Sequence, residues 1–184
     1  MRTTLAWTLT AAAAAASTAA LASPESPRAA TDEVLAPTSA GMIDEIAHWR
    51  SRTWYWQRLT GSRRWPTRYL ERRSEDTELH QELLRLWKER ASEARARAMR
   101  PPHRASWLCI HRFEGAWNSN TGNGYYGGLQ MDLGFQRRYG AWLLRMKGPA
   151  HRWTAIEQIW IAERARRVQG WYAWPSTARA CGLI

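Results

Sequence analysis

The chain has 184 residues and a formal net charge of +11 at pH 7, which suits one domain of ordinary size with appendages. A charge balance this basic favours an acidic partner: nucleic acid, an anionic membrane surface or an anionic polymer such as a cell wall. The five scattered histidines and two cysteines lack the spacing of metal ligands, and no phosphate-binding loop is present, so we predict neither a metal site nor a cofactor.

The first 22 residues have the pattern of a secretion signal. Arg2 supplies a positive charge, an alanine-rich apolar run follows, and Ala20-Leu21-Ala22 is an A-x-A cleavage site. A membrane anchor fits less well, because the run ends in small residues and continues into a proline-rich stretch. No later segment is long and apolar enough to span a membrane. We therefore expect a secreted, extracellular protein with no stable membrane insertion after signal cleavage.

Residues 23–40 are polar and contain three prolines, which is typical of a flexible linker. Residues 41–102 then carry apolar side chains at helical spacing in two runs, and a proline-containing turn separates the runs. The first run ends near Gly61, and Ser74 is the expected cap of the second. One apolar stripe follows the second run: Leu79, Leu83, Trp87, Ala91, Ala94 and Ala98. This part of the chain is predicted to form a helical hairpin.

Residues 103–184 are expected to form the compact domain. Its first helix spans residues 107–114, a polar turn-rich loop spans 118–124, and a strand or hairpin arm spans 125–131. A helical region interrupted at Gly140 follows. The predicted fold class is α+β, predominantly helical, with a short β-hairpin.

Three polar positions predict where helices of this domain begin. Thr154 and Glu157 have the spacing of a capping box, which starts a helix that runs to about Val168. Asp132 follows the predicted strand and fits an N-cap of the next helix.

The two cysteines, Cys109 and Cys181, are expected to pair. In an oxidising compartment an even pair most simply forms one disulfide, and two separate thiols are the alternative. The bond would tie the C-terminal tail to the helix that carries Glu114.

Among the four acidic residues of this domain, Glu114 is the one without an evident structural role. Glu157 and Asp132 fit helix starts, and Glu163 lies among arginines in mid-helix, where an exposed ion pair is the ordinary account. Glu114 has apolar neighbours at the end of its helix. A carboxylic acid that stays protonated in an apolar setting can donate a proton to a leaving group. A solvent-exposed carboxylate at a helix end is the alternative.

Two motifs in this domain are quite specific: NTGNGYYGGLQ at residues 120–130 and GWYAWP at residues 170–175. On these motifs, residues 103–184 resemble the transglycosylase-like domain of resuscitation-promoting factors, in particular secreted actinobacterial members with a helical N-terminal extension. The resemblance implies a small lysozyme-like fold and a cell-wall location. It also implies that the substrate is peptidoglycan glycan, cleaved at the β-1,4 bond between N-acetylmuramic acid and N-acetylglucosamine.

Carried over residue by residue, the resemblance places the catalytic glutamate at Glu114 and the family disulfide near Cys109 and Cys181. It places five residues on the hairpin that lines the glycan groove: Tyr125, Tyr126, Gly127, Gly128 and Gln130. Further candidate substrate contacts are Asn120, Thr121, Trp117, Trp171 and Trp174, the tryptophans as platforms for sugar rings.

The chain departs from the family pattern around the glutamate and after the hairpin. In the family the glutamate follows a cysteine directly, as in CESGGNW, whereas IHRF separates Cys109 from Glu114 here. The path from Glu114 to Thr121 is also two residues shorter. Phe135 stands where the family has a threonine, which puts the substrate-binding hydroxyl that the resemblance implies in doubt, and not the acid itself.

One well-placed carboxylate favours a mechanism in which the substrate supplies the nucleophile. Glu114 would protonate the glycosidic oxygen and then accept the proton of the muramic acid C6 hydroxyl, which attacks its own C1. The product is a 1,6-anhydro sugar, and the enzyme is a lytic transglycosylase. Hydrolysis by water needs the same glutamate, and the sequence leaves both outcomes open.

Two further functions remain as alternatives. A non-catalytic peptidoglycan-binding module would keep the groove and lack turnover, which the departures around Glu114 motivate. Nucleic-acid binding is motivated only by charge, and both secretion and the lack of a recognition motif argue against it.

Overall fold

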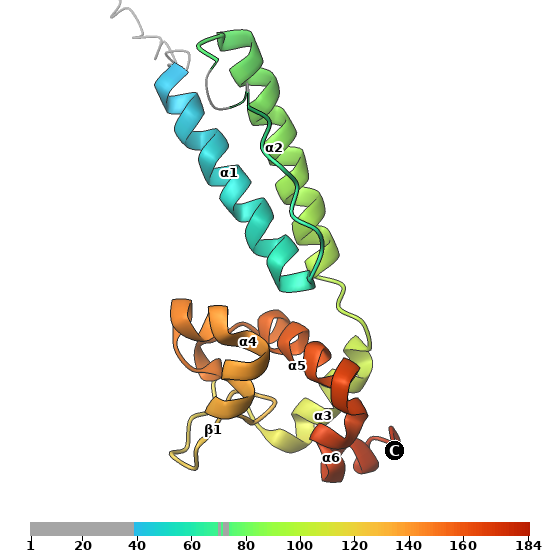
Figure 1. Cartoon of the computed structure of the whole chain (residues 1–184). Coiled ribbons are helices and arrows are strands. Elements are labelled where there is room, and N and C mark those ends of the chain that lie inside the picture. Colours follow the sequence, from blue (N-terminus) through green and yellow to red (C-terminus); the bar gives the residue numbers. More distant parts are fainter. Residues whose placement is uncertain (1–38, 70, 72–73) are drawn as a thin grey trace, which may run out of the picture. The chain divides into compact units, whose positions relative to one another are not determined.

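The structure, a computed structural model, describes residues 39–69, 71 and 74–184. The predicted secretion signal at residues 1–22 and most of the predicted linker lie outside these residues. The helices are α1 (Ser39–Thr60), α2 (Thr77–Ala98), α3 (Arg104–Glu114), α4 (Leu133–Lys147), η2 (Ala150–Arg152), α5 (Ala155–Gln169), η3 (Gly170–Ala173) and α6 (Pro175–Ala180). The strands are β1 (Tyr125–Tyr126) and β2 (Met131–Asp132), which pair antiparallel. The predicted class, α+β and predominantly helical with a helical hairpin before the domain, is confirmed (Figure 1).

Helices α1 and α2 form the predicted hairpin and run side by side (Figure 1). Their shared core consists of Ile46, Leu83 and Trp87, and partly buried tryptophans and leucines pack around it. Asp76, and not the expected Ser74, caps α2, because its carboxylate accepts hydrogen bonds from the backbone N–H groups of Glu78 and Leu79. The cap therefore lies closer to the helix than the apolar pattern indicated.

The helix starts predicted at Asp132 and Thr154 are confirmed, whereas α3 begins at Arg104 and not at the predicted residue 107. The Asp132 carboxylate accepts a 2.7 Å hydrogen bond from the backbone N–H of Phe135 at the start of α4. Thr154 and Glu157 form the expected capping box at the start of α5. Gly140 interrupts α4 with non-helical backbone angles, and the ring of Trp153 packs against it so closely that a Cβ atom would lie 2.8 Å away.

Side chains of α5 hold the C-terminal ends of both hairpin helices. The indole N–H of Trp160 donates to the backbone carbonyl of Ala98 at 2.8 Å. The guanidinium of Arg164 donates to the carbonyls of Arg58, at 2.6 Å, and Leu59, at 3.2 Å. The last carbonyls of a helix lack partners within the helix, so these bonds satisfy groups that would otherwise need water. Burial, followed by the charges of nearby arginines, lowers the pKa of Arg164.

A polar cluster next to these bonds joins α1 to the domain. Tyr55 of α1 donates to the carboxylate of Glu157, and the ammonium group of Lys147 lies 2.5 Å from the same carboxylate. Burial, and then the hydrogen bond to Glu157, raises the pKa of the Tyr55 phenol well above its ordinary value. Glu157 therefore does more than start a helix, because its buried carboxylate is also where the hairpin attaches.

One hydrophobic core spans α3, the β-hairpin, α4 and α5 and includes Trp174, and the end of α1 contributes Leu59 to it. Its largest fully buried members include Trp107, Ile110, Leu129, Met131 and Leu143. Glu163 lies inside this core with no exposed surface. The expectation of an exposed ion pair at Glu163 is therefore wrong, because the partners of this carboxylate include Trp107 and His103 from another segment.

None of the described helices is long and apolar enough to cross a membrane.

Candidate active site

Glu114 is the last residue of α3 and is half-buried. The helix stops there because Gly115 adopts a φ of 150°, which side-chain-bearing residues rarely adopt. Glu114 lines a cavity of about 340 Å³ together with Tyr125, Gln130 and Trp174. Residues Ala173, Pro175 and Ser176 complete the lining. The cavity thus brings the end of α3, the β-hairpin and the GWYAWP segment to one place.

Two other cavities are larger but lie elsewhere. One of about 520 Å³ is lined by α1, the loop after it and α4, and one of about 400 Å³ lies along α2. Neither includes a residue of the NTGNGYYGGLQ or GWYAWP motif. We therefore place the candidate chemistry in the smaller cavity at Glu114.

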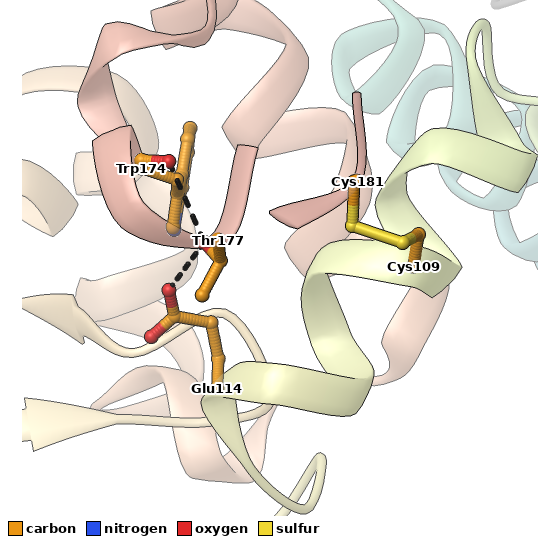
Figure 2. The surroundings of a disulfide bond; sticks show 5 residues. All are labelled: Cys109, Glu114, Trp174, Thr177 and Cys181. Carbon is orange, nitrogen blue, oxygen red and sulfur yellow. Dashed lines mark hydrogen bonds between the residues drawn. A yellow bond between two sulfur atoms is a disulfide. The ribbon is translucent and has the colours of Figure 1, made fainter. Parts of the chain in front are cut away.

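The Glu114 carboxylate is held by a residue that the sequence analysis did not single out. The hydroxyl of Thr177, on α6, donates a 2.8 Å hydrogen bond to Glu114 Oε1. Figure 2 shows this bond together with the Cys109–Cys181 disulfide, which joins the same two helices. The predicted disulfide is confirmed, and its sulfur atoms are 2.07 Å apart. The carboxylate therefore has one oxygen engaged by the protein.

Gln130 adopts an uncommon backbone conformation at the turn between β1 and β2. Its φ is 48°, a left-handed value that residues other than glycine seldom adopt. Its side-chain amide nitrogen donates to the carbonyl of Gly127 at 2.8 Å, and its backbone N–H donates to the same carbonyl. The turn is thereby closed twice, and the closure directs the Gln130 side chain toward the cavity that Glu114 lines.

Gly127 and Gly128 are buried, and the lining of the Glu114 cavity does not include them. A Cβ atom on Gly127 would lie 2.8 Å from Cδ of Gln158, and one on Gly128 would lie 2.6 Å from Nδ1 of His111. The two glycines therefore allow close approach of the protein's own side chains.

Gln158 fastens the β-hairpin to α5. This fully buried residue accepts a 2.8 Å hydrogen bond from the backbone N–H of Gly128. Its amide nitrogen donates to the carbonyls of Trp117, Ala150 and Trp153 at 2.8 to 3.0 Å. All hydrogen bonds of this amide go to backbone groups. Gln158 therefore positions both the hairpin, through Gly128, and the segment that follows α3, through Trp117.

The three candidate tryptophans occupy different places. Trp174 is almost fully buried, lines the cavity, and donates its indole N–H to the carbonyl of Leu129 at 2.8 Å. Trp117 stacks on His111 with ring centres 3.9 Å apart. Trp171 packs against Trp107, and the Arg166 guanidinium lies 5.3 Å from its ring centre. Of the three, only Trp174 is among the residues that line the Glu114 cavity.

The remaining candidates lie around the hairpin. Asn120 and Thr121 are exposed in the loop that precedes β1. Tyr126 stacks on His151, with ring centres 5.6 Å apart, and the neighbouring Tyr125 is exposed and lines the cavity. Phe135, where the family pattern has a threonine, packs against Trp174 with ring centres 5.5 Å apart.

Thr177 and Gln158 are not among the site residues predicted from the sequence, for two different reasons. Thr177 lies on α6, four residues before Cys181, which directly follows that helix. Once Cys181 is paired with Cys109, helical spacing places Thr177 one turn further along the same helix face. Gln158 follows Glu157 in a helix start that needed no further explanation, so no local pattern distinguished it.

No group of three or more His, Cys, Asp or Glu side chains that could hold a metal ion occurs in residues 39–69, 71 and 74–184.

Comparison with known proteins identifies the region around this cavity. Residues 103–177 match the family described as transglycosylase-like domain. The chain is 42% identical over 69 residues to resuscitation-promoting factor Rpf1 of Corynebacterium glutamicum, which covers 38% of this chain and 35% of that protein. It is 41% identical over 69 residues to Rpf of Micrococcus luteus, covering 38% and 29% of the two chains. It is 42% identical over 76 residues to RpfE of Mycobacterium tuberculosis, covering 40% and 41%.

The matches span less than half of each of these three relatives, and they leave the helical hairpin of this chain outside the matched family region. The resemblance inferred from NTGNGYYGGLQ and GWYAWP is confirmed. Residues 103–177 therefore match a transglycosylase-like domain and are related in sequence to resuscitation-promoting factors.

Proposed function

We propose that this protein cleaves the glycan strands of peptidoglycan at the β-1,4 bond between N-acetylmuramic acid and N-acetylglucosamine, with Glu114 as the single catalytic carboxylate. The observation that carries the proposal is the cavity at Glu114. It brings a half-buried carboxylate together with residues of both sequence motifs, Gln130 of the first and Trp174 of the second. The transglycosylase-like family match and the names of the relatives support this substrate class.

In the proposed reaction Glu114 acts first as an acid and then as a base. The neutral acid donates its proton to the glycosidic oxygen while the bond to C1 of the muramic acid breaks toward an oxocarbenium-like state. The carboxylate that results accepts the proton of the C6 hydroxyl as that oxygen bonds to C1. The reaction leaves a 1,6-anhydro end and regenerates the neutral acid, so no second carboxylate is required.

The local chemistry of the cavity supports a single-acid mechanism. The other acidic residues of the domain all have structural partners: Asp132 caps α4, Glu157 holds Tyr55 and Lys147, and Glu163 holds Trp107. None of these three lines the cavity with Glu114.

We propose a secreted location for the protein, at the cell wall. The apolar N-terminal run with its A-x-A site supports secretion, and the net charge of +11 favours attraction to an anionic wall polymer. The Cys109–Cys181 disulfide fits an oxidising compartment.

A non-catalytic peptidoglycan-binding module is the second candidate. The insertion of IHRF between Cys109 and Glu114 and the presence of Phe135 in place of a threonine favour it. In such a module the cavity would bind glycan without turning it over.

The experiment that separates these functions is digestion of purified peptidoglycan followed by mass spectrometry of the soluble products. We expect 1,6-anhydro products from the wild-type protein and at least about a hundredfold less product from Glu114→Gln, since general acid catalysis contributes that much or more. Glu93→Gln serves as the control, because Glu93 is exposed on the hairpin in a pair with Arg97. Reducing ends without anhydro sugars would indicate hydrolysis, and binding without products would favour the second candidate. Full activity of a folded Glu114→Gln protein would overturn the assignment of Glu114.

A further inference from the structure

We infer that Thr177 is a positioning residue for the acid: its hydroxyl holds Glu114 Oε1, so that the other carboxylate oxygen, Oε2, exchanges the proton with the glycan. The inference rests on the proposed function and adds a residue to it. Thr177 lies outside both sequence motifs and outside the lining of the cavity, so it acts through Glu114 and does not contact the glycan itself.

The direction of the hydrogen bond follows from two distances. The Thr177 hydroxyl lies 2.8 Å from Glu114 Oε1 and 3.5 Å from the backbone carbonyl of Trp174 (Figure 2). A threonine hydroxyl has a single hydrogen, so it can donate to only one of them at a time. The shorter distance has the geometry of a strong O–H···O bond, whereas 3.5 Å is at the limit of a weak one. The hydrogen therefore goes to the carboxylate.

This donor decides which oxygen of the neutral acid carries the proton. Because Oε1 already accepts a hydrogen from Thr177, a proton on Oε1 would meet the Thr177 hydrogen, and the acidic proton belongs on Oε2. After that proton has passed to the leaving group, the same hydroxyl stabilises the ionised carboxylate, since hydrogen bonds to charged acceptors are about twice as strong as neutral ones. The carboxylate then takes up the proton of the C6 hydroxyl at Oε2, which regenerates the neutral acid.

The disulfide fixes the distance over which this hydrogen bond forms. On α3, Cys109 lies five residues before Glu114, and Cys181, the residue directly after α6, lies four residues after Thr177. The covalent bond and the hydrogen bond are thus two successive links between the same pair of helices, about one helical turn apart. Helix α6 has only six residues, and a helix that short is marginal by itself. Its docking through Cys181 keeps the Thr177 hydroxyl within reach of Glu114.

Few other polar groups compete for the carboxylate. Tyr125 is the other titratable side chain that lines the cavity, and Gln130 contributes an amide whose nitrogen is bonded to Gly127. His111, one turn before Glu114 on α3, directs its Nδ1 to the carbonyl of Gly128 at 3.2 Å. In the part of the chain that the structure describes, Thr177 is the side chain with a hydrogen bond to Glu114.

The test compares Thr177→Val, which keeps the shape of the side chain and removes the hydroxyl, with Thr177→Ser, which keeps the hydroxyl. We expect kcat for release of soluble peptidoglycan fragments to fall roughly tenfold to a hundredfold in Thr177→Val, the range for loss of a charge-assisted hydrogen bond. Thr177→Ser should stay within about threefold of the wild type. Binding to insoluble peptidoglycan should be unchanged in both variants, because Thr177 lies outside the cavity lining.

A second readout reports on the acid itself. Loss of a donor to the carboxylate destabilises its ionised form, so the alkaline limb of the pH–rate profile, where the acid loses its proton, should move to higher pH in Thr177→Val and not in Thr177→Ser. A merely structural role of Thr177 would not move this limb. Thr53→Val is the matched control, since the buried Thr53 hydroxyl bonds the Trp49 carbonyl on α1, away from the cavity. Thr177→Ala replaces the valine variant if valine does not fold.

The outcomes separate this inference from the proposed function. If Glu114→Gln is inactive but folded Thr177→Val has wild-type kcat and pH profile, the positioning role is overturned and Glu114 stands. If Thr177→Ser loses as much activity as Thr177→Val, the hydroxyl is not what matters and the positioning role is likewise overturned. Full activity of Glu114→Gln overturns both. In a Glu114→Gln background, adding Thr177→Val should cause no further loss, since the two residues act as one unit.

Discussion

The indole N–H of Trp107 donates a 2.6 Å hydrogen bond to the carboxylate of Glu163 in the interior of the domain. Trp107 lies in the first half of α3 and Glu163 in the middle of α5, and neither has exposed surface. His103 and Arg166 bond the same carboxylate, at 3.0 and 3.1 Å. The helix that ends in Glu114 is therefore fixed to α5 near its first turn, and the disulfide at its midpoint joins it to the residue that follows α6.

Removing the Glu163 carboxylate should strongly destabilise the fold. In Glu163→Ala the Trp107 N–H loses its acceptor in the core and Arg166 loses its partner, so we expect a loss of about 3–5 kcal/mol of unfolding free energy. Glu163→Gln keeps an acceptor oxygen and should cost less. Urea denaturation measures both. Glu93→Ala, which removes an exposed pair with Arg97, should change stability by less than about 0.5 kcal/mol. Equal losses for Glu163→Ala and Glu93→Ala would contradict this account.

The disulfide should contribute to stability and to activity. It closes a loop with a sequence separation of 72 residues, for which chain entropy predicts about 4 kcal/mol. The double variant Cys109→Ser/Cys181→Ser should lose stability of this order in urea denaturation. It should also lose activity under conditions where it remains folded, because α6 carries Thr177. The wild-type protein under strong reductant should behave in the same way. An unchanged denaturation midpoint would show that packing alone holds α6 to α3.

Two glycines with nearly the same φ should respond very differently to substitution by alanine. Gly127 has a φ of 77° and Gly122 a φ of 82°. An alanine at either position is therefore destabilised by a backbone strain of about 1–2 kcal/mol. A Cβ at Gly122 meets no atom within 4 Å, whereas one at Gly127 runs into the amide of Gln158. We expect Gly127→Ala to cost at least about 2 kcal/mol more than Gly122→Ala, measured by thermal or urea denaturation. Equal losses of stability in the two variants would mean that the Gln158 side chain moves aside and keeps its hydrogen bonds to the backbone.

Tyr55 should make stability fall at alkaline pH. Its pKa in the folded protein is raised by burial and by Glu157, so the unfolded chain releases this proton first as the pH rises. The contribution of Tyr55 is fully present below the ordinary tyrosine pKa of about 10 and decreases above it. Tyr55→Phe should lose about 1–3 kcal/mol at pH 7, and the difference from wild type should narrow above about pH 10.

The control for this pH effect is Tyr172→Phe, because Tyr172 is 71% exposed. Its denaturation midpoint should follow the wild type at each pH. A constant difference between Tyr55→Phe and wild type from pH 7 to pH 11 would rule out the linkage to Tyr55 ionisation.

Much of the local structure could be predicted from short patterns. The capping box at Thr154 and the cap at Asp132 depend on residues within three positions of each other, so the sequence specified them directly. The disulfide followed from the number of cysteines and the secretion pattern. The same reliance on local patterns made the prediction for Glu163 wrong. Its sequence neighbours are arginines, one of which bonds it, whereas the indole N–H of Trp107 that explains its burial comes from α3.

The helical hairpin, the small α+β domain and the cysteine pair could be predicted from the sequence alone, and its two motifs resemble those of transglycosylase-like domains. These depend on periodicity, capping and composition, which are local properties of a chain. Which residues meet at Glu114 depends on how the helices pack in three dimensions. Thr177 reaches that carboxylate from 63 positions away, and Gln158 on α5 accepts a hydrogen bond from the backbone N–H of Gly128 in the hairpin, 30 positions away. No sequence pattern encodes such pairs, because their proximity arises only when the helices pack around a common core.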